Sequence, residues 1–562
     1  MGHSRWNLLP AVPDKLWTSS GFPRLIAQLL YNRGLAFDQV DSFIAGDQRL
    51  SGDPFLLPDM PKAVVRIYQA LLSGENIAVY GDFDTDGITA TAILVQGLSL
   101  LNCRATPYIP HRLTEGYGLK TAALEKLSQQ GISLVISVDC GITAISEVKK
   151  SRKLGLDVII TDHHLPLEEL PPAAAVVNPK LRGSKYPFAD LSGAGVAFKL
   201  LQALFHGVGK QDRIGELTDL VALGTVADMA PLLGENRYLV KEGLKTLSAS
   251  PRLGVKEVVT QAGLDVSNLD AECISWTIAP RLNAAGRLEH AMSSYRLLMT
   301  DSAEEARELA AWLELKNTER QKLTSKAFAS AREQVLAQGI FPLLLASDAE
   351  FPAGICGLVA SKLAEEFYRP AIVIRVGEQF SSGSCRSIPE FNIVNALTQC
   401  SRLFTHFGGH AQAAGFSLLT RNLPRLQQAL LEIATTQLDG VDLRPRLDID
   451  AEVALPALGG DTFPLLQKLA PFGCGNPLPA FLSREVQVLD CRTMGENSTH
   501  LKLKLKQGRT VWNGVGFGLG GYQAEVSPLI DIVYNLEVDH WGGTDRFRLN
   551  ILDFVPSSRI QR

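Results

Sequence analysis

The sequence has no apolar run near the roughly 20 residues needed to cross a bilayer. Its first stretch, MGHSRWNLLPAVPDKLW, contains no apolar block of signal-peptide length. Gly2 is not followed by Ser or Thr at position 6, so the myristoylation pattern is also missing. We therefore expect a cytoplasmic location and no contact with a membrane.

Paired cysteines and an excess of charge are missing as well. The eight cysteines are scattered without a C-x-x-C pair, which fits reduced thiols better than a disulfide framework or a zinc site. The net charge is −4, so binding to nucleic acid would require a local basic groove. The sequence shows no repeat and no low-complexity segment. Its bulk composition leaves the function open.

Apolar strands alternate with helices from residue 77 onward. Strands are expected at 77–82, 105–110, 133–139 and 157–164, and helices follow near 87–102, 119–130 and 142–153; 24–46 and 61–74 are also expected to be helical. This alternation is typical of an α/β fold whose parallel sheet is covered on both faces. Ligands of such sheets bind at the carboxyl ends of the strands.

The 562 residues are long for one domain, and we expect several. A helical block (193–206, 214–228, 237–248) precedes a long polar helix near 302–338, whose alternating charges suit a connector. A second α/β region contains a small-residue loop at 408–418. Five successive antiparallel strands near the C-terminus indicate a small β-barrel. The expected division is 1–300, 301–338, 339–437 and 443–562.

Three aspartates follow the first strand at every second position, in the segment DFDTDG. If the strand continues through them, Asp82, Asp84 and Asp86 all point to one face. Two carboxylates about 4 Å apart repel by roughly 4 kcal/mol at an effective dielectric near 20, so this arrangement favours a bound cation. DFDTDG matches the first half of a calcium loop, but the twelfth position is Ile93 instead of a glutamate. The calcium-loop interpretation therefore fails.

Further acids and imidazoles follow the next strands. Asp139 ends one strand in VDCG, the run Asp162-His163-His164 ends another in TDHH, and Asp228 lies in the apolar stretch LGTVADMAPL. A single aspartate at a strand end is more often a helix cap, but this convergence favours metal binding. Carboxylates and imidazoles without thiolates suit Mn²⁺ or Mg²⁺. They are too many for one ion, and two ions sharing Asp139 would serve in-line phosphoryl displacement.

These motifs resemble those of the DHH phosphoesterase superfamily. The likeness extends through PRLNAAGR (280–287), GSCRSI (383–388), FGGHAQAAGF (407–416) and LAPFGCGNPLPAF (469–481). In this order, and over nearly the whole chain, the set is similar to the bacterial RecJ family of single-strand-specific 5′→3′ DNA exonucleases. The resemblance implies a DHH domain with N-terminal helices at 1–300, a connecting helix at 301–338, a DHHA1 domain at 339–437 and an OB-fold at 443–562.

The resemblance also implies roles for the residues of the strand ends. Asp84 and Asp139, helped by Asp82, would hold one divalent ion. The residues implied for the second ion are Asp86, Asp139, His163 and Asp228. His164 would stabilise charge on the scissile phosphate, and Asp162 would orient a histidine or the backbone. The products would be 5′-mononucleotides, released in DNA repair and recombination.

A 5′-end enzyme must also bind the terminal phosphate. The matching positions are Arg112, Arg287, Ser384 and Arg386, with Gly409 and His410 in a glycine loop that lets backbone approach a phosphate. Without the resemblance, each arginine would be interpreted as a solvated surface charge. In the family pattern a His-bearing pair precedes the turn of the second domain, whereas this chain has Phe351-Pro352 there. A contact to substrate made by that histidine would be missing.

The C-terminal strands allow two interpretations. Lys502, Lys504 and Lys506 alternate and so share one strand face; with Trp512, Phe517 and Trp541 they would bind a single strand by charge and base stacking. Alternatively, the lysines protect an edge strand around an aromatic core.

Two other functions stay open. One is a DHH phosphodiesterase acting on short oligonucleotides or small nucleotides, and the other is a non-catalytic RecJ-like replication scaffold. The partners implied by the resemblance are single-stranded DNA with a 5′ end, a single-strand-binding protein and a helicase.

Overall fold

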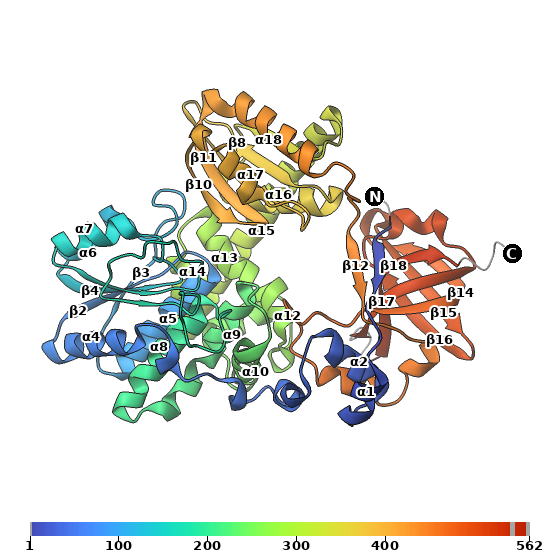
Figure 1. Ribbon diagram of the computed structural model, residues 1–562, viewed down its shortest axis with the longest axis horizontal. Helices are drawn as coiled ribbons and strands as arrows, with labels where there is room; N and C mark the ends of the chain where they lie inside the picture. Colours follow the sequence, from blue (N-terminus) through green and yellow to red (C-terminus); the bar gives the residue numbers. More distant parts are fainter. Residues whose placement is uncertain (1–2, 540–545, 558–562) are drawn as a thin grey trace. The chain divides into compact units, whose positions relative to one another are not determined.

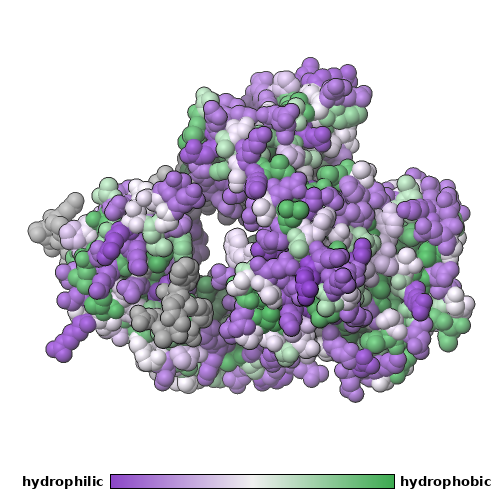
Figure 2. Space-filling view, turned by 180° about the vertical axis from the view of Figure 1, so that it is seen from behind, coloured by the Kyte–Doolittle hydropathy of each residue, from purple (hydrophilic) through white to green (hydrophobic). Residues whose placement is uncertain are grey.

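A computed structural model describes residues 3–539 and 546–557 of the chain (Figure 1). The contacts within the chain divide it into two compact units. One unit comprises Gly46–Gly440 with Gly473–Gly475, and the other comprises Met1–Ala45, Val441–Phe472 and Asn476–Arg562. The face seen in Figure 2 is mostly hydrophilic, with hydrophobic residues scattered among polar ones. Within the described ranges, no helix is both long and apolar enough to span a membrane.

A five-stranded, all-parallel sheet forms the first half of the larger unit. Its strands, in spatial order, are β3 (Thr106–Tyr108), β2 (Asn76–Tyr80), β4 (Ile132–Val138), β5 (Asp157–Thr161) and β6 (Ala175–Val177). The helices around it are α4 (Met60–Ser73), α5 (Thr85–Leu100), α6 (Thr121–Gln129), α7 (Ile145–Lys153) and α8 (Gly193–Val208). The predicted parallel sheet is confirmed.

Successive residues of β2, β4, β5 and β6 enter two different cores. In β2, Ile77 and Val79 pack into the core that α4, α5 and α8 share, whereas Ala78 and Tyr80 pack into the core under α6 and α7. Because side chains alternate across a strand, burial on both faces requires the continuous apolar run seen in the sequence. The two cores fix the sheet, and with it the positions of the loops that follow its strands.

Further helices complete this part of the unit. They are α9 (Thr218–Ala227), α10 (Gly234–Ala249), α11 (Leu253–Gln261), α12 (Ala271–Cys273), the π-helical turn η6 (Ile274–Ile278), α13 (Ala279–Leu288) and α14 (Met292–Met299). Helix α5 packs against both α8 and α9. The approach to α8 is close at Gly97, where a Cβ would lie 2.2 Å from the Leu201 side chain. Most residues of α5 are buried, so the acids at its start have a rigid support.

The long helix α15 (Ala303–Gln338) leads to a second sheet, and its first turn is capped by Ser302. The strands of this sheet, in spatial order, are β10 (Phe404–His410), β11 (Ala413–Leu419), β9 (Phe380–Arg386), β8 (Ala371–Arg375) and β7 (Leu344–Asp348). The helices beside it are α16 (Cys356–Phe367), α17 (Ile393–Gln399) and α18 (Leu423–Gln437). The loop expected at 408–418 is wrong: its residues form the β10–β11 hairpin, with Gly409 opposite Ala414.

The smaller unit contains a closed five-stranded barrel. Its strands are β14 (Phe481–Met494), β15 (His500–Gln507), β16 (Thr510–Gly516), β17 (Leu529–Asp539) and β18 (Arg546–Pro556). They pair in the order β14-β15-β16-β18-β17, and β17 pairs back to β14. The barrel is confirmed, but its strands are not all antiparallel, because β16 and β18 run parallel. Beside it lie β13 (Ala451–Glu452) and α19 (Thr462–Gln467).

The N-terminal segment folds with the barrel and not with the parallel sheet. Strand β1 (Arg5–Leu8) pairs with β12 (Arg446–Ile449), and the helices that follow are α1 (Asp14–Ser20), α2 (Arg24–Asn32) and α3 (Val40–Ala45). Asn32 donates to the carbonyl of Asp450 at 2.9 Å. The expected domain 1–300 therefore differs from the structure at 1–45. The single helix expected at 24–46 is interrupted near Gly34, which has φ 67°.

Candidate metal centre and phosphate pocket

The predicted metal ligands meet at the carboxyl ends of three neighbouring strands. Strands β2, β4 and β5 end at Tyr80, Val138 and Thr161, and the acids and histidines follow directly. Strand β2 does not continue through the aspartates, which was the condition for their sharing one strand face. Asp84 instead caps α5, accepting hydrogen bonds from the backbone N–H groups of Asp86 and Gly87 at 3.1 Å each. The helix turn, and not strand alternation, brings these carboxylates together.

Three overlapping sets of side chains each bring their ligand atoms within 4.8 Å of one another. The first set is Asp82, Asp84 and Asp139; the second is Asp139, His163 and His164; the third is Asp86, His163 and Asp228. Asp139 and His163 each belong to two sets, and Asp139 Oδ1 lies 3.0 Å from His163 Nε2. The structure therefore gathers all six predicted metal ligands, with Asp139 and His163 at the points where the sets overlap.

Several buried ligand atoms at this centre form no hydrogen bond within the described part of the chain. These atoms are Asp82 Oδ1, Asp139 Oδ1 and His163 Nε2, although the last two lie 3.0 Å from each other. An unpaired buried polar atom costs about 1–3 kcal/mol, and more when it is charged. Burial and the neighbouring acids raise the pKa of Asp86 to about 7 and that of Asp228 to about 8. Divalent cations would satisfy these atoms and the crowded charge, so the residues present fit them.

His163 is poised as a neutral ligand. Burial, followed by repulsion from His164, lowers the pKa of His163 to about 3. A neutral imidazole offers the lone pair that metal coordination requires. Its Nδ1 lies 3.8 Å from Asp228 Oδ2, and its Nε2 lies 3.9 Å from Asp86 Oδ2.

Asp162 belongs to none of the three ligand sets and positions its neighbours. Its carboxylate accepts from the backbone N–H groups of Ile142, His163 and His164 and lies 2.8 Å from His164 Nδ1. These bonds outweigh the effect of burial and lower the pKa of Asp162. Despite burial, the contact with Asp162 raises the pKa of His164 to about 9, so the ring is cationic at neutral pH. A cationic ring beside the acids suits the stabilisation of phosphate charge.

Backbone N–H groups hold Asp86 in place. The N–H groups of Gly193 and Ala194, in the first turn of α8, donate to its two oxygens at 2.6 and 2.9 Å. A Cβ at Gly193 would lie 2.5 Å from the Cβ of Asp139, so only glycine allows this approach. This contact was not predicted from the sequence. The signal available for it was the segment SGAG before an apolar helix, which suits a helix N-terminus that binds an anion.

Four arginines form a second cluster next to the acids. The guanidinium of Arg112 lies over the ring of Phe83, 4.7 Å from the ring centroid. Phe83 stands between Asp82 and Asp84 in the sequence, so this arginine is close to the acids. Burial and the charges of Arg112, Arg320 and Arg386 lower the pKa of Arg287 to about 9. Among the described residues, no carboxylate forms an ion pair with these four arginines. Guanidinium groups without a directly bonded carboxylate fit a phosphate.

The remaining predicted phosphate ligands lie on the second sheet. Ser384 and Arg386 are two residues apart on β9, so their side chains share a face. His410, at the end of β10, stacks its ring on that of His164 at 6.2 Å between centroids. Gly409 has φ 144°, and a Cβ there would lie 2.4 Å from the carbonyl oxygen of Ala413, so glycine permits the tight hairpin. Phe351 is buried in the core of this sheet.

Comparison with known proteins agrees with this arrangement. Residues 76–225 match the N-terminal domain of the DHH family, residues 333–436 match the DHHA1 domain, and residues 449–553 match the RecJ OB domain. The single-stranded-DNA-specific exonuclease RecJ of Bacillus subtilis is 40% identical over 98% of this chain and 71% of its own. The Salmonella typhimurium protein of the same name is 33% identical over 95% and 96%.

This chain belongs to the RecJ family. A crystal structure described as RecJ in complex with Mn²⁺, from Thermus thermophilus, matches with a TM-score of 0.85 and 31% identity, covering 98% of this chain and 79% of the other. A structure of the same protein with Mg²⁺ matches with a TM-score of 0.78. The DHH, DHHA1 and OB organisation implied by the sequence resemblance is therefore confirmed.

Other residues near the RecJ-type site were not found from the sequence. The Tyr117 hydroxyl lies 3.2 Å from His164 Nδ1, and Asn178 donates to the His164 carbonyl at 2.9 Å. Asn283, on α13, accepts the N–H of Thr85 at 2.9 Å and so supports the first turn of α5. Arg320, on α15, is the fourth arginine of the phosphate cluster. The sequence positions of these four residues do not distinguish them from ordinary polar residues of the protein surface.

The OB barrel excludes one of the two interpretations of its lysines. Strand β15 pairs with β14 on one side and β16 on the other, so the edge-strand interpretation is wrong. Lys502 and Lys504 are exposed on the outer face, while the leucines between the lysines are buried inside. Trp512 lies opposite Leu505 and therefore on the inner side, which does not fit stacking on the outer face. Phe517 is exposed, and Trp541 lies outside the described residues.

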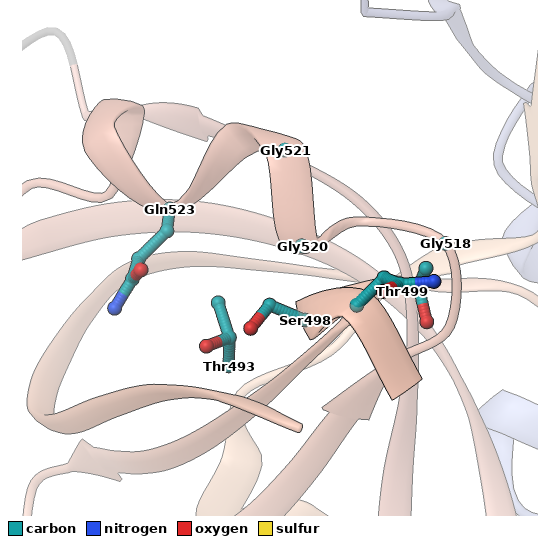
Figure 3. Close-up of a pocket in the computed structure, with 8 residues that line it drawn as sticks. Thr493, Ser498, Thr499, Gly518, Gly520, Gly521 and Gln523 are labelled. Carbon is teal, nitrogen blue, oxygen red and sulfur yellow. The ribbon is translucent and has the colours of Figure 1, made fainter. Parts of the chain in front are cut away.

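A polar pocket of about 550 Å³ opens at one end of this barrel (Figure 3). It lies between the β14–β15 connection and the turn that follows β16. Its lining residues are Thr493, Asn497, Ser498, Thr499, Gly518, Gly520, Gly521 and Gln523. This lining offers hydroxyl, amide and backbone groups without a charge, so the pocket suits hydrogen bonding more than capture of a phosphate.

Proposed function

We propose that this chain is a single-strand-specific exonuclease that hydrolyses DNA from its 5′ end and releases 5′-mononucleotides, in DNA repair and recombination. The observation that supports it most strongly is the arginine cluster beside the overlapping acid and histidine sets, which forms no ion pair with a carboxylate of the described residues. Arg112 lies over the ring of Phe83, and Phe83 stands between two of the acids in the sequence. A terminal phosphate held by the arginines would place the next phosphodiester at the acids.

The residues have distinct roles in this proposal. Asp82, Asp84 and Asp139 would hold one Mn²⁺ or Mg²⁺ ion. The ligands of a second would be Asp86, Asp139, His163 and Asp228. Two such ions supply a water nucleophile at neutral pH and stabilise charge on the phosphate. Asp162 keeps the ring of His164 oriented and charged, so that it can neutralise the oxygens of the scissile phosphate.

The terminal phosphate would be bound by Arg287, Ser384 and Arg386, with Arg112 bridging toward the acids. His410 would close the site through its stacking on His164, and Gly409 lets the hairpin backbone come near. We also propose that a helicase and a single-strand-binding protein supply the unpaired strand. The eight cysteines, none in a disulfide, support a cytoplasmic location.

One cleavage assay tests this function. The substrate is a long single strand with a 5′-phosphate and a 3′-end label, incubated in Mn²⁺ beside a blunt duplex. We expect labelled products that shorten from the 5′ side, and none from the duplex. Shortening from the 3′ side would overturn the assigned polarity. A preference for a 5-nucleotide over a 40-nucleotide strand would favour a phosphodiesterase of short oligonucleotides.

Arg386→Ala is expected to reduce the preference for a 5′-phosphate over a 5′-hydroxyl end by about tenfold or more. Charge-assisted hydrogen bonds contribute about 1.5–3 kcal/mol, and they act only on the phosphorylated end. Initial rates on matched 5′-phosphate and 5′-hydroxyl strands measure the ratio. Arg425→Ala, on the exposed side of α18, is the control. Equal losses on both strands would show that Arg386 contacts another part of the substrate.

Replacing Lys502, Lys504 and Lys506 together by glutamine is expected to weaken binding of a 40-nucleotide strand and flatten its salt dependence. Each phosphate neutralised on a single strand contributes about 0.7 to the slope of log K against log salt, so the slope should fall by about 2. Fluorescence anisotropy across a KCl series measures this slope. A variant with unchanged slope would assign the contact to another face of the barrel.

A further inference from the structure

An exposed tryptophan lies on the helix that leads to the phosphate pocket. Trp276 is 77% exposed, the largest exposed fraction of any aromatic side chain among the described residues. It occupies the π-helical turn η6, directly before α13. Turns of this type are rare and frequently occur at functional sites. Leaving a tryptophan in water forgoes its burial energy, so a ligand that covers this ring would gain that energy.

Trp276 shares one side of this helix with two residues of the site. The buried positions are Ile274, Ile278, Ala279, Leu282, Ala284, Ala285 and Gly286. The side away from them bears Trp276, Pro280, Asn283 and Arg287, at the i, i+4, i+7, i+11 spacing of one helix face. Asn283 contacts the turn that bears Asp84 and Asp86, and Arg287 belongs to the phosphate cluster. The face therefore extends from the phosphate pocket, past the acids, to the tryptophan.

The order along this face gives a direction. Asn283 lies about 6 Å from Arg287 along the axis, and Trp276 lies about 10 Å beyond Asn283, at 1.5 Å per residue. If Arg287 binds the 5′ phosphate, the strand beyond the scissile bond continues toward Trp276. At about 3.4 Å per stacked nucleotide, 10 Å spans roughly two to three nucleotides.

We propose that Trp276 stacks on a base of the single strand, two or three nucleotides to the 3′ side of the scissile bond. This inference rests on the proposed function. The exposed neighbour Ser275 is uncharged, and Pro280 follows on the same face. Glu272, one turn before Trp276, is exposed and negatively charged, so this position suits the apolar plane of a base and not a phosphate. Stacking on an aromatic ring accepts every base, as an exonuclease without sequence preference requires. It would hold the incoming strand in line with the acids after each cleavage.

Abasic substitution at single positions tests this stacking. Strands with a 5′-phosphate carry one abasic site at each of positions 2 to 6, and release of the first nucleotide is measured in Mn²⁺. We expect the wild type to be slowed most by an abasic site at position 3 or 4. Trp276→Ala should cleave the intact strand about tenfold more slowly at low substrate concentration and lose this dependence on position, whereas Trp276→Phe should keep it.

A 5′-phosphorylated dinucleotide separates stacking from a structural role. It ends before Trp276, so Trp276→Ala should cleave it at the wild-type rate; slower cleavage of the dinucleotide would indicate a distorted site and overturn the inference. Phe380→Ala is the control, because Phe380 is 53% exposed at the far end of β9 from Arg386. An unchanged abasic profile in Trp276→Ala would also overturn the inference while leaving the nuclease function intact. A wild type inactive on every strand would instead contradict the proposed function.

Discussion

Asp139→Asn is expected to lower the rate of single-strand cleavage by about 10³-fold or more. Asp139 belongs to two of the three ligand sets, and its Oδ1 lies 3.0 Å from His163 Nε2. An asparagine keeps the shape of the side chain but removes the charge that two cations would share. Cleavage of a 5′-phosphorylated strand in Mn²⁺ measures the loss, and Mn²⁺ titration of the protein shows whether binding is lost with it.

Asparagine is a better choice here than alanine, for a backbone reason. Asp139 has φ 58°, a left-handed conformation that asparagine and aspartate tolerate better than most residues. Asp139→Ala would therefore combine the loss of charge with backbone strain. Asp157→Asn is the matched control, because Asp157 begins β5 at the opposite end of the same sheet. Activity of Asp139→Asn within about tenfold of wild type would refute a shared ligand at this position.

The convergence of the site could be predicted from the sequence because it follows from parallel pairing. Once 77–82, 133–139 and 157–164 are recognised as neighbouring parallel strands, their carboxyl ends must meet at one edge. Asp139 and His163 then lie close together whatever the details of the loops. The alternating lysines of β15 were predictable for the same kind of reason, since a strand has a fixed period of two.

Local geometry after the strand ends could not be predicted in the same way. A two-residue spacing of aspartates is compatible with a strand and also with a helix cap followed by its first turn. The cap prevails because Asp84 can satisfy the N–H groups of Asp86 and Gly87, while α5 is held between α8 and α9. The glycines at 408–409 were ambiguous too, because glycine suits a loop as well as a tight hairpin.

Contacts between distant parts of the chain were beyond the sequence patterns. Pairing of Arg5 with Arg446 brings two short strands together that have no distinctive composition. The amides of Gly193 and Ala194 reach Asp86 only because α8 packs on α5. Arg320 lies within a long polar helix, where one more arginine is unremarkable in sequence. In each case tertiary packing gives an ordinary residue its role.

The metal-free protein is expected to lose stability as the pH rises from about 4 to about 8. Burial raises the pKa of Asp86 to about 7 and that of Asp228 to about 8, and raises those of Asp82 and Asp139 as well. The unfolded chain releases these protons near pH 4, so the native state holds more protons across this window. The protein is then most stable at a pH below the pKa values of these aspartates in the unfolded chain. It loses stability as the pH rises through their pKa values in the folded state.

The histidines modify this slope without reversing it. The pKa of His163 is lowered to about 3, so this residue adds stability as the pH rises toward 6.5. This gain offsets the loss of stability caused by one of the four aspartates. The pKa of His164 is raised to about 9, so this residue extends the loss of stability to pH values above 6.5. The net fall in the free energy of unfolding should be of the order of a few kcal/mol. Thermal denaturation in a chelator at pH 5, 6, 7 and 8 measures it.

Added Mn²⁺ should restore the stability that is lost at high pH, because a ligand bound only by the native state at 100 times its Kd contributes about 2.7 kcal/mol. Asp139→Asn separates this effect from the pH dependence of the rest of the chain. Without metal, the variant should be more stable than wild type at pH 8, since one crowded carboxylate is gone, and it should gain less from Mn²⁺. A metal-free wild type equally stable at pH 5 and pH 8, or an equal gain from Mn²⁺ in both proteins, would contradict an electrostatically strained centre that cations relieve.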